Sequence, residues 1–183
     1  RKAAAGNIRN LVVDLPPGFV GAPAAVGECN QAQFTLGKCP PSSQVGRFDA
    51  AVDPYLPLYS MSQISAGVFN LSHPLGVVSD IAFQIAGNPV HIKASLDPAN
   101  RYAIRTEVRD INESLPAFNQ KLTIWGVPAD PSHDAERCKE FSNFFGGDTS
   151  EECSTDIERK PFLSMPSQCD SDNTFLLHSY DSW

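Results

Sequence analysis

The chain has 183 residues, of which 42% are hydrophobic and 19% charged, a composition typical of a folded protein with one domain or two small ones. A net charge of -7 and only 14 scattered Lys and Arg residues argue against nucleic-acid binding, because phosphate contacts depend on clustered basic side chains. No apolar run approaches the roughly 20 residues that span a bilayer, so we expect no membrane insertion.

Residues 1–6 carry two positive charges but lack the apolar core of a signal peptide. The chain also begins without Met and reaches a strand-like segment almost at once. We therefore expect a processed or excised piece of a larger protein. Residues 1–183 should form a single β-rich module, with a helix and an acidic loop inserted at about 130–159.

The first third of the chain predicts short strands separated by turns. Residues 7–15 are largely apolar and predict a strand, which Pro16-Pro17-Gly18 ends with a fixed turn. Between Cys29 and Cys39 there is room for one helical turn, after which Pro40-Pro41 cannot continue a helix. Two further strands are expected at residues 43–52 and 55–61.

The clearest pattern lies in the middle of the chain, where Ile81, Phe83 and Ile85 alternate with smaller or polar residues. A turn at residues 87–89 then leads into a second alternating segment, so the pattern predicts a β-hairpin. Residues 102–108 place apolar side chains on one face and charged ones on the other, which indicates a core face and a water face. Residues 121–125 complete this meander.

A helix is predicted over residues 130–145, because Asp130 can cap its first turn, Pro131 suits the first helical position and Gly146-Gly147 ends it. An acidic loop follows, and the last strands are expected at residues 162–165 and 174–180. With about eight or nine strands, the sequence predicts a mainly β fold: an antiparallel β-sandwich or jelly-roll-like domain with one short helix and long loops.

The five cysteines favour disulfides in an oxidising compartment over a metal site, since neither a CxxC pair nor a zinc-type His spacing occurs. Local spacing favours two disulfides, one between Cys29 and Cys39 and one between Cys138 and Cys153. Cys169 is then left over. We expect it to bond outside this segment or to change the pairing within it.

The segment richest in potentially catalytic groups places Ser132, His133 and Asp134 side by side. Because neighbouring side chains at a helix start diverge, we interpret these residues as capping and solvated groups and not as a triad. The chain has no GxSxG, HExxH or P-loop motif. The sequence therefore predicts a protein that is not an enzyme and uses no cofactor.

Metal binding is weakly indicated. The histidines (His73, His91, His133 and His178) lie in separate segments, which favours ordinary structural roles. The acidic loop offers hard oxygen ligands that suit calcium, but it lacks the register of an EF-hand and also fits a solvated loop. The calcium candidates are Asp148, Glu151, Glu152 and Asp156.

Exposed aromatic residues could form a platform for stacking sugars, although aromatic residues in strands more often lie in cores. A glycosidase would need two carboxylates that face each other across a cleft. Asn70 and Asn112 begin short N-glycosylation patterns. The candidate stacking residues are Tyr55, Tyr59, Trp125, Tyr180 and Trp183.

Four sequence segments are distinctive, and we call them the signature phrases: DLPPGFVG (residues 14–21), CPPSSQVG (39–46), LTIWGVPADPSHDAER (122–137) and KPFLSMPSQC (160–169). With the closing Asp181-Ser182-Trp183, these signature phrases resemble a segment conserved in large, secreted, multi-module surface proteins of actinobacteria. The resemblance runs across nearly the whole chain. It implies an extracellular compartment and neighbouring β-rich modules, and it assigns no catalytic residue.

We therefore expect a non-enzymatic extracellular module with a structural or adhesive role in a cell-surface or filament-forming protein. The alternative is a carbohydrate-binding or glycoside-hydrolysing β-sandwich module, which predicts a cleft with converging carboxylates and aromatic rings. The expected partners are neighbouring β-rich modules or identical subunits, and surface carbohydrate. Exposed loops or a sheet edge, for which residues 174–180 are a candidate, would make these contacts.

Overall fold

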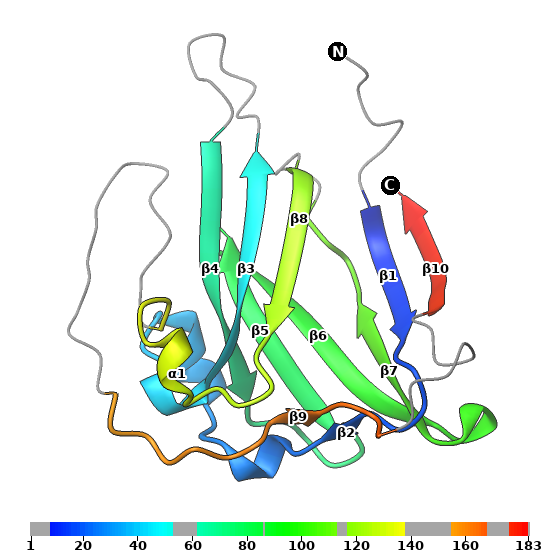
Figure 1. Cartoon of the computed structure of the whole chain (residues 1–183). Helices are drawn as coiled ribbons and strands as arrows, with labels where there is room; N and C mark the ends of the chain where they lie inside the picture. The colour runs from blue at the N-terminus through cyan, green and yellow to red at the C-terminus, as the bar shows by residue number, and fades with distance from the viewer. Residues whose placement is uncertain are drawn as a thin grey trace, which may run out of the picture.

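A computed structural model of the chain describes residues 8–52, 62–85, 87–112, 117–137, 155–167 and 176–182 (Figure 1). Residues 52, 62, 117, 118 and 176–182 are described by their backbone alone. In these ranges the strands are β1 (Ile8–Asp14), β2 (Val20–Gly21), β3 (Gln44–Val52), β4 (Ser62–Leu71), β5 (Ser79–Ile85), β6 (Asn88–Asp97), β7 (Ala103–Val108), β8 (Ala117–Ile124), β9 (Leu163–Ser164) and β10 (Leu176–Ser182). The helices are α1 (Gln31–Thr35) and the 3-10 helices η1 (Pro23–Ala25), η2 (Pro41–Ser43), η3 (Pro98–Asn100) and η4 (Pro131–His133).

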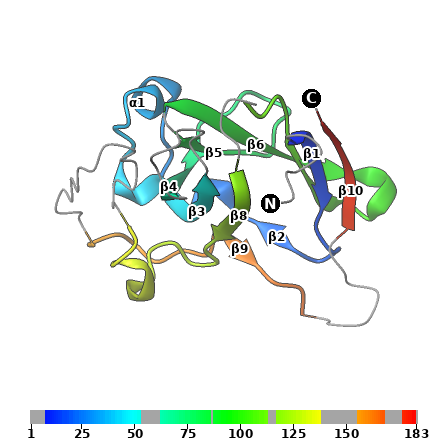
Figure 2. The ribbon, with the colours of Figure 1, turned by 90° about the horizontal axis from the view of Figure 1, so that it is seen from above.

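Eight strands form one antiparallel sheet in the order β10-β1-β7-β6-β5-β4-β3-β8. The sheet curls, so that β3, β4 and β8 lie across the interior from β6 and β7 (Figure 1, Figure 2). β2 and β9 pair separately and cross beneath the lower end of the curl as a two-stranded ribbon (Figure 1). The predicted mainly antiparallel β fold is thus confirmed, and one continuous sheet supplies both layers of its sandwich-like arrangement.

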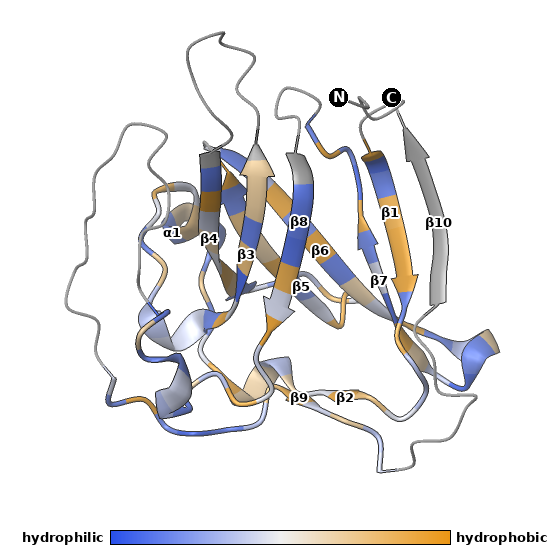
Figure 3. Cartoon of the chain, turned by 45° about the horizontal axis from the view of Figure 1, so that its top comes forward, coloured by the Kyte–Doolittle hydropathy of each residue, from blue (hydrophilic) through white to orange (hydrophobic). Residues whose placement is uncertain are grey.

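The predicted hairpin in the middle of the chain is present as β5 and β6, which pair from Ser79 opposite Ala94 to Ile85 opposite Asn88. Alternating hydropathy along these strands, visible for β6 in Figure 3, directs every second side chain to the concave face of the curl. Ile81, Ile92 and Val108 occupy matching register positions on β5, β6 and β7. One apolar row therefore runs across these three strands.

The main core fills the concave face. Phe48 of β3 and Phe83 of β5 stack with ring centroids 4.2 Å apart and an interplanar angle of 13°, which joins the two sides of the curl. Fully burying one such side chain contributes about 1.5–3 kcal/mol. The buried members of this core are Val45, Phe48, Ala50, Ala66, Val68, Phe83, Ile92, Val108 and Phe162.

A disulfide-closed lobe covers part of the convex face. The predicted Cys29–Cys39 disulfide is confirmed, and α1 between the two cysteines is the helical turn that the sequence predicts there. Asn30 and Gln33 form a capping box at the start of α1, where each side chain accepts the other residue's backbone N–H at 2.9 and 3.2 Å. Phe34 is 3% exposed and belongs to a small second core on the convex face, formed by Cys29, Phe34, Leu71 and Ala82.

The helix predicted over residues 130–145 differs from the structure in its described part. Asp130 caps it and Pro131 follows the cap, as predicted, but η4 is a single 3-10 turn and residues 134–137 continue as turns. Arg137 explains the tight conformation, because its guanidinium reaches back to the carbonyl oxygens of Pro128 and Asp130. The remainder of that prediction, together with the strand predicted at residues 55–61, lies outside the described residues.

We expect the Cys29→Ser/Cys39→Ser double variant to lose about 3 kcal/mol of unfolding free energy, because the disulfide closes a loop with a sequence separation of 10. The lobe over the convex face should loosen with it. Urea unfolding of the variant and the wild type, followed by circular dichroism, measures the difference. Equal midpoints and slopes for the two proteins would show that packing around Phe34 holds the lobe without the covalent link.

Candidate functional site

The four signature phrases, which are far apart in sequence, meet at the base of the curled sheet. The carbonyl of Gly126 accepts the backbone N–H of Phe162 at 2.8 Å, and the carbonyl of Phe162 accepts that of Ala22 at 2.8 Å. Trp125, the residue before Gly126, donates its backbone N–H to the carbonyl of Val45 at 2.9 Å. Backbone hydrogen bonds thus join the 122–137 phrase to the 160–169 and 39–46 phrases, and residue 22, next to the 14–21 phrase, joins the same base.

The 14–21 phrase opens with a buried carboxylate. Asp14 is 3% exposed and lies opposite Arg105 in the β1–β7 register. Arg105 donates to both carboxylate oxygens, from Nε at 2.7 Å and from Nη2 at 3.0 Å, and it also pairs with Asp97 at 2.8 Å. The hydrogen bond with Asp14 raises the pKa of Arg105. The polar face of β7, predicted to meet water, therefore carries a bidentate ion pair with a buried partner.

Two glycines in the signature phrases are required by their surroundings. Gly18 has φ of 98°, a left-handed conformation, and a Cβ there would lie 2.9 Å from Cβ of Pro166. Gly46 sits where β3 and β8 approach each other, and a Cβ there would overlap the carbonyl of Thr123. The glycines of both phrases thus permit close backbone approaches within the scaffold.

The 122–137 phrase builds a compact turn on a buried tryptophan. Trp125 is 3% exposed, and its ring stacks on His133 with centroids 4.5 Å apart and an interplanar angle of 8°. Asp130 accepts the backbone N–H of Ser132 at 2.9 Å and its hydroxyl at 2.6 Å. These hydrogen bonds, the hydroxyl first, lower the pKa of Asp130 below its ordinary value. Asp130 and Ser132 therefore hold the start of this turn through side-chain hydrogen bonds.

Arg137 closes the same turn from inside. Its side chain is 1% exposed, and Nη2 donates to the carbonyl of Pro128 at 2.9 Å and to that of Asp130 at 3.3 Å. The same nitrogen lies 3.0 Å from the carboxylate of Asp134. Nη1 is buried and has no hydrogen-bond partner within the described part of the chain. Such a cation is costly to bury, so its contacts fix the loop between Pro128 and Asp134 strongly.

The side chains of Ser132, His133 and Asp134 engage three different partners: Asp130, Trp125 and Arg137. This divergence agrees with the interpretation of the segment as a capped turn, and the predicted capping role of Asp130 is confirmed. The proposed ligand-stacking role of Trp125 is wrong, because its ring is buried against His133. A β-strand that ends on an apolar aromatic residue favours packing, and here packing prevails.

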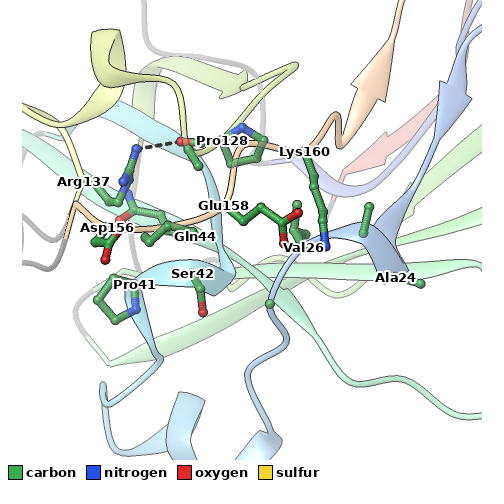
Figure 4. Close-up of a pocket in the computed structure, with 14 residues that line it drawn as sticks. Ala24, Val26, Pro41, Ser42, Gln44, Pro128, Arg137, Asp156, Glu158 and Lys160 are labelled. Carbon is green, nitrogen blue, oxygen red and sulfur yellow. Dashed lines mark hydrogen bonds and ion pairs between the residues drawn. The ribbon is translucent and has the colours of Figure 1, made fainter.

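A polar pocket of about 440 Å³ lies among these phrases, between η1, η2, the turn after β8 and residues 156–160. Figure 4 shows Arg137 and Asp156 at one end and Lys160 beside Glu158 at the other. Lys160 pairs with Glu158 at 2.8 Å, and Ser42 and Gln44 line the wall between the two ends. The pocket can therefore offer hydrogen-bond donors and acceptors of both charges to a polar ligand.

Most other predicted site residues lie outside the described ranges: Cys138, Cys153, Cys169, Asp148, Glu151, Glu152, Tyr55, Tyr59 and Trp183. For His178 and Tyr180 only the backbone is described. Asp156 is exposed on the rim of the polar pocket. In the described part of the chain, no group of three or more His, Cys, Asp or Glu residues is placed to hold a metal ion.

The two glycosylation patterns differ in accessibility. Asn70 is fully buried, and its Nδ2 donates to the carbonyl oxygens of Pro23 and Gly27, both at 3.1 Å. Because a glycan attaches to that nitrogen, the folded chain has no room for one at Asn70. Asn112 is exposed, with its Nδ2 2.9 Å from Oδ1 of Asn88.

Sequence reasoning missed two charged residues that organise the base. Arg105 stands in an alternating strand among other charged residues, and nothing in that pattern separates a paired arginine from a solvated one. Arg137 closes the predicted helix start, where a basic residue is unremarkable. The one available signal was Asp14, a carboxylate placed directly between an apolar strand and a proline turn.

No protein-family model, no curated protein and no solved structure matches this chain. Among the described residues, none of the helices is long and apolar enough to cross a membrane.

The Asp130 cap should make stability depend on pH in the acid range. A carboxyl whose pKa is lowered by folding stabilises the fold above its ordinary pKa of 3.8, and that contribution is lost as the pH falls through the lower folded-state value. We expect Asp130→Asn to be less stable than wild type at about pH 6, with the gap closing below about pH 4. Thermal unfolding across this range measures it, and parallel curves for the two proteins would contradict it.

Arg137→Leu should lose about 3 kcal/mol of unfolding free energy, because it leaves buried carbonyl oxygens without their donor and removes the partner of Asp134. Arg109→Leu is the matched control, since Arg109 forms an exposed ion pair with Glu107 and its side chain is 69% exposed. The control should change by no more than about 0.5 kcal/mol. Denaturant unfolding compares both variants with wild type, and equal losses would contradict the structural role of Arg137.

Proposed function

We propose that the chain is a non-enzymatic extracellular module with a structural or adhesive role, which associates with β-rich neighbours through a free sheet edge. The observation that carries the proposal is strand β8. It lies at the end of the sheet order and pairs with β3 alone in the described part of the chain. In the described part of the chain, no strand pairs with the other side of β8, so its backbone donors and acceptors there can pair with a further strand.

β8 has few of the features that normally protect an edge strand. It contains no proline, and Lys121 is its one charged residue in eight. Natural edge strands are usually short or carry prolines, bulges or several charges that block strand addition. The register shift opposite Ala51 and Val52 distorts the first part of β8, and the pairing from Asn119 to Ile124 is regular. This regular stretch is the part that we propose to pair with a neighbour.

The opposite edge of the sheet is β10, which pairs with β1 from Ile8 opposite Ser182 to Asp14 opposite Leu176. The sequence-based expectation that the last strand lies at an edge agrees with this position. A module with two edges can add a neighbour on either side, which is the geometry that a chain or filament of modules requires. The Cys29–Cys39 disulfide supports an oxidising, extracellular compartment for such an assembly.

The side chains of the signature phrases support a scaffold role more than a catalytic one. Asp14, Asp130 and Arg137 are engaged by partners within the chain. The polar pocket favours a second candidate, carbohydrate binding, because Asp156 and Glu158 bring two carboxylates to one lined space. That function remains a prediction beside the leading proposal.

The edge proposal is tested on the full-length protein with Leu122→Lys. Leu122 faces the concave side opposite Phe48 in the β3–β8 register and is 42% exposed. An inward-pointing lysine on an edge strand blocks strand addition. In size-exclusion chromatography with multi-angle light scattering, we expect the wild-type protein to have the mass of an assembly and the variant to have the mass of a monomer.

Tyr102→Lys is the control for the edge experiment, since Tyr102 is 67% exposed and lies in the turn before β7, away from β8. It should assemble as the wild type does, and circular dichroism should show that both variants are folded. A wild-type protein that is monomeric across a wide concentration range, or a Leu122→Lys variant that still assembles, would overturn the proposal.

A further inference from the structure

A cavity of about 310 Å³ lies between the concave face of the sheet and the β2–β9 ribbon that crosses beneath it. The sheet side is formed by residues of β5, β6 and β7, including Ile81, Ala94 and Ile104. The ribbon side is formed by Val20 and Leu163 with their neighbours. The space is open to solvent on one side, and its volume is at the lower end of the range found for small-molecule binding sites.

The chemistry of the lining is almost wholly apolar. Among the described residues that line the cavity, Ser79 and Thr106 are the only ones with polar side chains, and none is charged. The hydroxyl of Thr106 already donates to the carbonyl of Val13 at 3.0 Å. Water needs two to four polar partners to be stable in a cavity, whereas apolar cavities of roughly half this volume stay dry and take up hydrocarbons.

The cavity also opens onto an apolar rim. Three of its lining residues are among the exposed large hydrophobic residues of the chain: Val20 at 60%, Leu96 at 46% and Val78 at 37% exposure. A void caused by loose packing has no reason to continue into exposed apolar side chains. A binding site for an elongated apolar group is expected to continue into exposed apolar side chains, because the group extends from the enclosed space across the rim.

We infer that this cavity binds the hydrocarbon chain of a lipid-like amphiphile, with the chain between the sheet and the β2–β9 ribbon and the polar head in water beyond the rim. The absence of charge in the lining excludes a charged group from the interior, since no partner there would offset its desolvation. This binding site shares no lining residue with the polar pocket, and Ile124 is the β8 residue that it includes. It adds a ligand to the module and does not depend on the proposed assembly.

Dodecanoate below its micelle concentration is the probe, and isothermal titration calorimetry on the intact chain is the measurement. We expect wild type to bind one equivalent and to unfold at a higher temperature in its presence. Ala94→Leu, which extends a side chain into the cavity, should weaken binding at least tenfold while keeping the fold. Ala135→Leu, the same change at an exposed position on the turn after β8, should bind as wild type does.

A second matched pair covers the possibility that Ala94→Leu does not fold. Leu96→Asp places a charge on the exposed rim and should also weaken binding at least tenfold, whereas Leu36→Asp, at a 70% exposed position beside α1, should not. Absence of dodecanoate binding to wild type would overturn the inference. Equal binding by Leu96→Asp and Leu36→Asp would overturn it as well, since the ligand would then lie elsewhere.

Discussion

The fold depends on the curl of one open sheet, whose two walls face each other across the core. Eight antiparallel strands supply both walls of the interior, and the stacked rings of Phe48 on β3 and Phe83 on β5 join the two walls. A flat sheet would leave that apolar face in water, so burial of the concave face is what makes the curl stable. The β2–β9 ribbon crosses the lower end of the curl, and the disulfide-closed lobe packs on its convex face.

The curl of the sheet explains the residues of the signature phrases. Each comes to the base, where a strand leaves the sheet and the chain must turn sharply without losing its backbone hydrogen bonds. Pro-Pro-Gly, Gly46 and the capped turn at Asp130 are three solutions to that problem, and Arg137 supplies donors to carbonyl oxygens that would otherwise be buried alone. The proline, glycine and capping residues of the signature phrases are thus explained by the turns that they form.

The predictable parts of this structure are those encoded by neighbours in sequence. Alternation identified the β5–β6 hairpin, spacing identified the Cys29–Cys39 disulfide, and the Asp-Pro pair identified a capped turn. Contacts between distant segments were not predictable: Asp14 finds Arg105 across 91 positions, and an alternating strand does not reveal its neighbours in a sheet. The cavity and the polar pocket could not be predicted from the sequence for the same reason, since both are lined by segments that only the tertiary fold brings together.

The pairing of β1 with β10 determines how the folded chain responds to a pulling force. Ile8 lies opposite Ser182, so the first and last described residues are neighbours at one corner of the sheet (Figure 1). Tension applied at this corner separates the two strands one hydrogen bond at a time, as a zip opens, and does not shear all of them together. Under load, β10 would peel away first, while the base, the disulfide lobe and the remaining seven strands of the sheet stayed intact.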